Sequence, residues 1–252
     1  MNDSDGFATW VDALGVRLRI DADQMLTARL EAAWSACLTE PDGSAHVTVR
    51  EPAAARSDAV EHRLERVTQE VTQAVLHARA GQLLMLHACA VADPRTGASL
   101  VFVGPSGMGK TTLALTLGRE WGYVTDEAVG VEPDGRVVPY RKPLSLRTPG
   151  EPWKRQVSPD GLGLRRPTGR LQIARLLLLD RQPGAREATI STVSTVHAIT
   201  MLAEHTSYLV RLDRPLGRLA EVLKATGGLR RVAYADAGQI AGMARSLLEG
   251  VV

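Results

Sequence analysis

The alternation of apolar and polar residues predicts a mixed α/β protein. Residues 15–21 and 46–50 alternate in the manner of half-buried strands, and residues 23–38 between them have a helical pattern. A longer amphipathic helix is expected to begin near Ser57, because apolar residues then recur every three or four positions. This apolar face consists of Val60, Leu64, Val67, Val71, Val75 and Ala78.

The middle of the chain predicts two adjacent buried strands followed by a helix. Residues 83–93 and 99–104 are almost entirely apolar, and the short segment that joins them contains proline and glycine, which favour a turn. Residues 110–121 have a helical pattern, and residues 123–140 are typical of a strand, a Glu-Pro-Asp-Gly turn and a second strand.

The C-terminal part predicts one more buried strand, three helices and a short strand. These elements are expected at residues 175–181 for the first strand, at 192–205, 216–226 and 236–249 for the helices, and at 229–235 for the short strand. Before them, residues 148–170 are rich in proline, glycine and arginine and have no period, which predicts a long surface loop of the kind that often contacts substrate. We therefore expect a small N-terminal α/β segment, residues 1–80, and a core, residues 81–252.

Composition and charge exclude several classes of function. The formal charge of +2 is too small to predict a nucleic-acid-binding surface. No apolar run approaches the roughly 20 residues of a membrane span, and the acidic N-terminal stretch lacks the apolar segment of a signal peptide. Cys37 and Cys89 have no metal-ligand spacing around them and are expected to be buried structural thiols. A cytoplasmic protein without nucleic-acid or membrane partners is expected.

The segment from Gly104 to Thr111, GPSGMGKT, matches the phosphate-binding pattern G-x-x-x-x-G-K-[ST]. An apolar strand precedes it and a helix follows it, so backbone N–H groups and the helix N-terminus can converge on phosphate oxygens. Lys110 is expected to reach the β and γ phosphates of a nucleotide, and the Thr111 hydroxyl is expected to bind Mg²⁺. The predicted nucleotide-binding residues are Gly104, Ser106, Gly107, Met108, Gly109, Lys110, Thr111 and Thr112. The alternative is a strand–turn–helix connection that binds nothing.

Two acidic positions compete to serve the metal or the reacting hydroxyl. Asp126 and Glu127 come shortly after the predicted P-loop helix, at the next strand, whereas Asp180 ends the apolar run RLLLLD. Mg²⁺ prefers oxygen ligands, and a kinase also needs a carboxylate near the acceptor hydroxyl. An Asp-Glu pair can also be simply a solvated strand start, so the residues alone leave this choice open.

His87, the P-loop and the pair Asp126-Glu127 together resemble the catalytic domain of HPr serine kinase/phosphorylase. That family has a histidine at the head of a strand, a short hairpin, a glycine-rich loop, a helix and then two aspartates, and residues 83–135 show this order with similar spacing. The resemblance implies an HPr-kinase/PEP-carboxykinase-like core with a mixed central sheet and flanking helices. It also implies catalytic roles for His87, Lys110, Asp126 and Glu127, and metal binding by Thr111, Asp126 and Glu127.

The chain departs from the family at several points. Thr111 replaces a serine and Glu127 an aspartate, and the N-terminal domain of HPr kinases is larger than residues 1–80 allow. These differences argue against HPr itself as substrate and against the reverse, phosphorylase reaction. The chain is more similar to HPr-kinase-like proteins, some of which phosphorylate serine in ribosomally made precursor peptides such as lasso peptides.

The sequence thus predicts a kinase that uses ATP, or another nucleoside triphosphate, and Mg²⁺ to phosphorylate a hydroxyl, most simply a serine of a peptide or protein. A small-molecule kinase and a non-catalytic nucleotide-binding regulator or assembly factor are the alternatives. Lys142 and Arg147, the first and last residues of the segment KPLSLR, could hold phosphate or an acidic substrate, or be solvated charges. The sequence leaves the oligomeric state open.

Overall fold

The computed structural model describes residues 7–41, 43–52 and 58–250, and it divides the chain into two compact units. The first unit comprises the chain up to Arg79 together with Arg141–Gly163, and the second comprises Ala80–Tyr140 and the chain from Leu164 onward. Ser57, near which the long amphipathic helix was expected to begin, lies outside the described residues.

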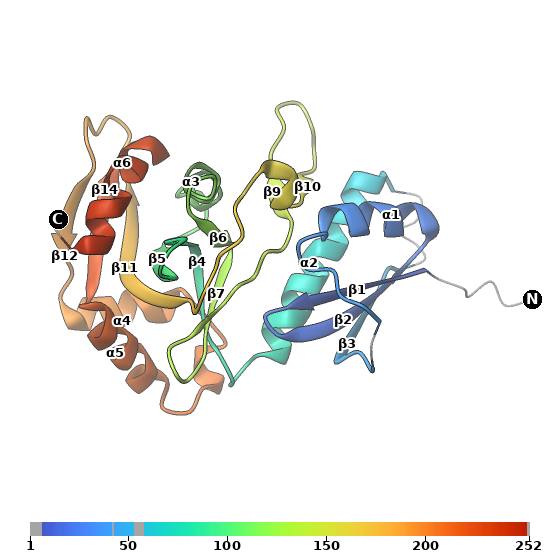
Figure 1. Ribbon diagram of the computed structural model, residues 1–252, viewed down its shortest axis with the longest axis horizontal. Coiled ribbons are helices and arrows are strands. Elements are labelled where there is room, and N and C mark those ends of the chain that lie inside the picture. The colour runs from blue at the N-terminus through green and yellow to red at the C-terminus, as the bar shows by residue number, and fades with distance from the viewer. Residues whose placement is uncertain (1–6, 42, 53–57, 251–252) are drawn as a thin grey trace, which may run out of the picture. The chain divides into compact units, whose positions relative to one another are not determined.

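The first unit contains a three-stranded sheet in the order β1-β2-β3. Its strands are β1 (Phe7–Ala13), β2 (Val16–Ala22) and β3 (Val47–Arg50), and its helices are α1 (Gln24–Ala33) and α2 (Val60–Ala78) (Figure 1). Strand β2 alternates buried and half-buried residues, as its sequence predicts, because one face packs on the helices. Helix α1 begins after Asp23, whose side chain accepts a hydrogen bond from the Leu26 amide at 2.9 Å.

Residues 141–163, which the sequence-based division assigned to the core, pack with the first unit. They contain the two-stranded pair β9 (Leu144–Leu146) and β10 (Arg155–Val157) and the short 3-10 helix η2 (Asp160–Leu162). The Lys154 amide donates to Glu65 Oε2 on α2 at 3.0 Å, and the Ser35 and Ser158 hydroxyls are 2.7 Å apart. The loop predicted over 148–170 is therefore partly structured, through pairings between distant residues that local periodicity cannot indicate.

A buried ion network in the first unit gives a prediction about stability. Arg63 is 3% exposed and donates to both carboxylate oxygens of Glu51, at 2.6 and 2.7 Å, and to Asp23 Oδ2 at 2.5 Å. The change Arg63→Met leaves the buried Glu51 carboxylate uncompensated, so the free energy of unfolding in urea should fall by about 3 kcal/mol. The matched change Arg50→Met removes an ion pair whose arginine side chain is 80% exposed, and it should cost less than about 1 kcal/mol. Equal losses in the two variants would contradict this prediction.

The second unit is built on a mixed nine-stranded sheet. The main strand order is β12-β14-β11-β5-β4-β7-β8, and β6 and β13 also pair with β4. Strand β11 is parallel to β5 and β14, and the other pairs are antiparallel. The strands are β4 (Leu84–Ala92), β5 (Ala98–Val103), β6 (Gly122–Thr125), β7 (Ala128–Val131), β8 (Val137–Val138), β11 (Gln172–Arg181), β12 (Thr189–Thr192), β13 (Thr206–Ser207) and β14 (Leu229–Tyr234).

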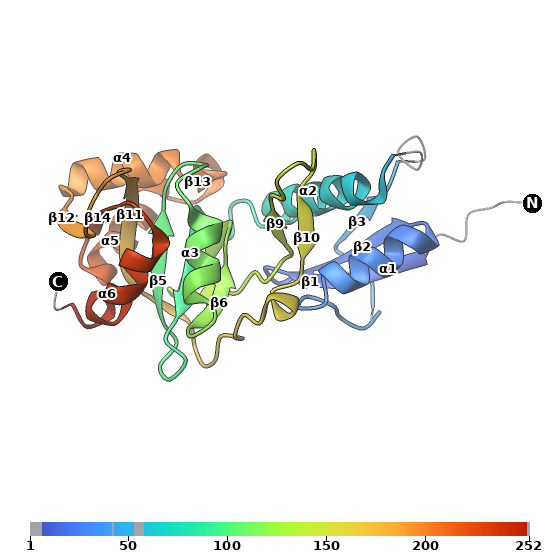
Figure 2. The same ribbon diagram turned by 90° about the horizontal axis from the view of Figure 1, so that it is seen from above.

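Helices cover both faces of this sheet. The helices α3 (Lys110–Leu117) and α6 (Ala237–Glu249) pack together on one face, and α4 (Thr195–Glu204) and α5 (Pro215–Thr226) pack together on the other (Figures 1 and 2). A short 3-10 helix, η3 (Leu209–Arg211), precedes α5. The helix predicted at 192–205 begins only at Thr195, because the unpredicted strand β12 ends just before it. Among the residues that the structure describes, no helix has the length and apolar character needed to cross a membrane.

Candidate functional site

The topology of the second unit brings three sequence motifs to one edge of the sheet. Strand β5 ends at Val103 and continues into the glycine-rich loop. Ala88 of β4 lies opposite Val103, which places His87 beside the start of this loop. Strand β6 is antiparallel to β4, so it runs parallel to β5 and delivers Asp126 and Glu127 to the same edge.

The glycine-rich loop has the backbone geometry of an anion-binding turn. Gly107 and Gly109 have φ of 88° and 86°, in the left-handed region that glycine adopts without a steric penalty. Helix α3 begins directly after Gly109, so its N-terminal N–H groups are available to an anionic ligand. The Tyr234 hydroxyl at the end of β14 donates a hydrogen bond to the Met108 carbonyl and ties the loop to the sheet. Ser106 in the loop and Thr112 in the first turn of α3 are both exposed.

Lys110 is held against the loop from which it projects. Its ammonium donates to the Gly104 carbonyl at 2.6 Å and to the Pro105 carbonyl at 2.9 Å, and the residue is 7% exposed. Burial lowers the pKa of Lys110, and the carboxylates of Asp126 and Glu127 act in the opposite direction. The ammonium is thus oriented within the loop, where a bound phosphate would be cradled.

Asp126 is a buried carboxylate that two hydroxyl groups hold in place. It is 6% exposed, and it accepts hydrogen bonds from Thr111 Oγ1 at 2.9 Å and from the Tyr123 hydroxyl at 3.0 Å. A hydroxyl oxygen next to a carboxylate is a donor set that suits Mg²⁺, which binds one or two protein carboxylates and completes its shell with phosphate oxygens and water. The described residues contain no group of three or more His, Cys, Asp or Glu that could form a metal cage. Thr111 and Asp126 therefore fit a phosphate-bound Mg²⁺ rather than an all-protein metal site.

Backbone hydrogen bonds place Glu127 and His205 beside β4, where His87 lies. The Ala88 amide donates to the Glu127 carbonyl at 3.1 Å, and the His87 amide donates to the His205 carbonyl at 2.6 Å. Burial, followed by the positive charge of Lys110, lowers the pKa of His87, and Glu127 opposes this shift. Burial and then Lys110 also lower the pKa of His205. Both imidazoles are therefore mainly neutral at pH 7, and Glu127 is close enough to His87 to act on its charge.

Asp180, Lys142 and Arg147 have different surroundings. Asp180 lies near the end of β11, the parallel neighbour of β5, where it accepts from Gln182 Nε2 at 3.0 Å and lies 3.7 Å from Arg231 Nη1. The Thr111 hydroxyl is bonded to Asp126 instead. Lys142 is buried in the first unit, where its ammonium donates to the Pro143 carbonyl at 3.0 Å, and Arg147 is exposed in the same unit.

Three residues of this region were not singled out from the sequence. Tyr123 could have been found, because it lies in the short strand β6, which ends directly before Asp126. His205 follows α4, and only the pairing of β13 with β4 brings it to His87. Tyr234 is 126 positions from Met108 in the chain, and no local pattern links the two residues. Non-local pairing therefore supplies much of the support around the predicted motifs.

The depressed pKa values of the two histidines predict how stability depends on pH. An unfolded histidine has a pKa of 6.5, so at mildly acidic pH the unfolded chain binds protons that His87 and His205 exclude in the folded state. Their contribution to the free energy of unfolding is fully present above pH 6.5 and is lost as pH falls through the folded pKa values. Urea unfolding at a series of pH values should show a flatter profile for the double variant His87→Gln/His205→Gln. The control His197→Gln, at an exposed histidine of α4, should keep the wild-type slope, and the same flattening in this control would contradict the assignment.

Comparisons with known proteins give limited information. No family model matches the chain, and no curated protein matches it. Among solved structures, the chain is similar to the Hpr(Ser) kinase/phosphatase from Coxiella burnetii, with 12% sequence identity and a TM-score of 0.36 over 66% of this chain and 97% of that one. The likeness is weak, and it does not assign the chain to a family.

Proposed function

We propose that the protein is an ATP- and Mg²⁺-dependent kinase that transfers the γ-phosphoryl group to a serine hydroxyl of a peptide or protein. The observation that supports this most is the buried Asp126 bonded to Thr111 at the glycine-rich loop, with Glu127 and His87 at the same edge of the sheet. A protein that only holds a nucleotide needs the loop and one acid. A second carboxylate and neutral imidazoles are groups that a transfer reaction can use.

Each residue has a proposed role that follows from its environment. Backbone N–H groups of the loop and the Lys110 ammonium bind the nucleotide phosphates. Thr111 and Asp126 would hold Mg²⁺, which neutralises charge on the phosphate oxygens when it is bound. Two hydroxyl donors occupy the Asp126 carboxylate, so we assign to Glu127 the role of accepting the proton of the substrate hydroxyl. His87 in its neutral form orients the transferred group through a hydrogen bond.

The substrate class is proposed from the sequence resemblance. HPr-kinase-like proteins include kinases of ribosomally made precursor peptides, and a precursor peptide such as that of a lasso peptide is the substrate that we propose to test first. Positioning and charge neutralisation supply most of the catalysis in phosphoryl transfer. The roles proposed above for Lys110, Thr111, Asp126, Glu127 and His87 are of these kinds.

A transfer assay with ATP labelled at the γ position tests the proposal. The protein is incubated with the labelled ATP, Mg²⁺ and the peptide encoded beside its gene, in parallel with a small-molecule extract. We expect label on a serine of the peptide, and we expect Glu127→Gln to abolish it while ATP binding is retained. Label in a small metabolite would instead identify a small-molecule kinase. Intact ATP binding with no label on any acceptor would identify a nucleotide-binding regulator.

A further inference from the structure

The outer edge of β1 in the first unit is only partly paired. β1 is the outer strand of its sheet and forms a hairpin with β2 in which Ala13 faces Val16 across a two-residue turn. In this register alternate residues bond to β2, so the backbone groups of Ala8, Trp10 and Asp12 are directed away from it. The segment after α1 covers one end of the edge, since the Asp12 amide donates to the Cys37 carbonyl at 2.8 Å and the Thr39 amide donates to the Trp10 carbonyl at 3.0 Å.

The covering segment leaves β1 after Thr39. The next residues are Glu40 and Pro41, and proline has no N–H group with which to continue the pairing. The N–H and C=O groups of Ala8 and the N–H group of Trp10 consequently have no hydrogen-bond partner among the described residues. An unpaired strand edge of this kind is a template for another extended chain.

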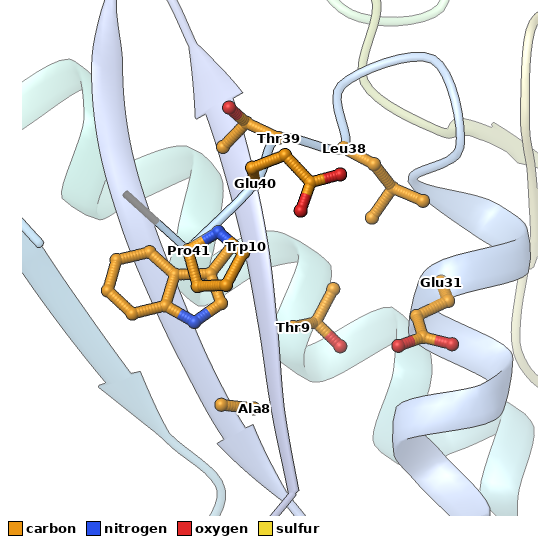
Figure 3. Close-up of a pocket in the computed structure, with 8 residues that line it drawn as sticks. All are labelled: Ala8, Thr9, Trp10, Glu31, Leu38, Thr39, Glu40 and Pro41. Atoms are coloured by element: carbon orange, nitrogen blue, oxygen red, sulfur yellow. The ribbon is translucent and has the colours of Figure 1, made fainter. Parts of the chain in front are cut away.

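A pocket of about 570 Å³ lies at this open edge (Figure 3). Its wall combines the edge strand with apolar surface from Trp10, Leu38 and Pro41 and with two exposed glutamates, Glu31 and Glu40. Figure 3 shows Glu31 on α1 and Glu40 on the segment after Leu38, so the two carboxylates come from different elements. The pocket is lined by Ala8, Thr9, Trp10, Glu31, Leu38, Thr39, Glu40 and Pro41, with no basic residue among them.

We propose that this pocket binds an extended, basic peptide segment, which adds to β1 as a further strand. The free backbone groups of Ala8 and Trp10 supply main-chain hydrogen bonds, as in other cases of strand addition. Glu31 and Glu40 select lysine or arginine, whose aliphatic stems can pack on Trp10 and Leu38. Pairing of β1 with a second copy of this chain is disfavoured, because each copy would bring the same two carboxylates to the interface.

The identity of the bound peptide segment rests on the proposed kinase function. If the protein is a peptide kinase, the bound segment is a part of the substrate other than the phosphorylated serine. Binding of the segment itself does not depend on phosphoryl transfer, so the two proposals can fail separately.

Fluorescence anisotropy with a short labelled peptide that alternates lysine and valine tests the site on the full chain without nucleotide. We expect saturable binding that weakens as salt is added and is at least about tenfold weaker for the matched peptide with glutamate in place of lysine. The double variant Glu31→Gln/Glu40→Gln should also lose about tenfold in affinity. The control Glu249→Gln changes an exposed glutamate at the end of α6 and should bind like the wild type.

The variant Ala8→Pro tests strand addition directly. It removes an N–H group that points away from β2, so the β1–β2 ladder remains while one edge hydrogen bond is lost and the added strand is obstructed. We expect at least a tenfold loss of affinity with an unchanged circular dichroism spectrum; if this variant does not fold, the glutamine variants carry the test. Equal binding of the lysine and glutamate peptides, or unchanged affinity in a folded Ala8→Pro variant, would overturn the proposal. A dimer of the free chain that Ala8→Pro dissociates would overturn it as well, since a second copy would then occupy the edge.

One comparison separates this proposal from the kinase proposal. Lys110→Ala should leave peptide binding unchanged, because Lys110 is not among the residues that line the pocket. Peptide binding without any phosphoryl transfer would support the peptide-binding pocket and contradict the kinase proposal. Phosphoryl transfer without binding of the basic peptide would support the kinase proposal and contradict the peptide-binding pocket.

Discussion

Replacing Lys110 with alanine is expected to lower the phosphotransfer rate by about 10²- to 10³-fold, the effect of losing one preorganised group that stabilises charge in the transition state. The Lys110 ammonium is already oriented by the Gly104 and Pro105 carbonyls and is almost completely buried, so water cannot replace it efficiently. Initial rates with labelled ATP measure the loss, and a fluorescent ATP analogue reports whether nucleotide affinity falls at the same time.

Lys224 provides the matched control for this change. It is an exposed lysine on α5 of the same unit, in a chain that has only four lysines. Lys224→Ala should leave the rate within about twofold of the wild type, as expected for a surface substitution. An unchanged rate in Lys110→Ala, or equal losses of rate in the two variants, would contradict a role for the glycine-rich loop in phosphoryl transfer.

The change Asp126→Asn is expected to lower the rate by about 10³-fold and to raise the Mg²⁺ concentration required for half-maximal activity. Asparagine keeps the size of the side chain and can still contact Thr111 and Tyr123, but it removes the negative charge from the proposed metal site. Rates measured over a series of Mg²⁺ concentrations separate weaker metal binding from a slower reaction.

Asp180→Asn is the control that decides between the two acids that the sequence left open. Asp180 is engaged with Gln182 and Arg231, so its replacement should change the rate by no more than a few fold, in the range of a partly exposed polar contact. A larger loss in Asp180→Asn than in Asp126→Asn would move the metal site to the end of β11 and contradict the roles proposed here.

The sequence predicted most of the local elements of the second unit. The apolar runs became β4, β5 and β11, and the glycine-rich motif forms a turn between a strand and a helix. The residues alone did not decide between Asp126 and Asp180, and only the family resemblance favoured Asp126. Which of the two carboxylates contacts Thr111 depends on strand order. Antiparallel β4 is inserted between β5 and β6, and this order determines which carboxylate meets Thr111.

Longer-range organisation was harder to predict. β1 was missed because its residues, FATWVDA, do not alternate strictly between apolar and polar. The return of residues 141–163 to the first unit depends on contacts such as the one between the Lys154 amide and Glu65, which are 89 positions apart. Propensity and periodicity report only on neighbouring residues, so such contacts leave no signal in them.

The insertion of β4 between β5 and β6 also has a consequence for how the chain folds. His87, the glycine-rich loop, Asp126 and Glu127 come from one continuous stretch of sequence, and β4 forms its pairings with β5, β6 and β7 inside this stretch, before β11 begins. Contacts of short sequence separation form faster than distant ones. During synthesis this stretch can therefore assemble before β11 and β14 leave the ribosome, and Tyr234 fastens the loop from β14 only when the chain is nearly complete.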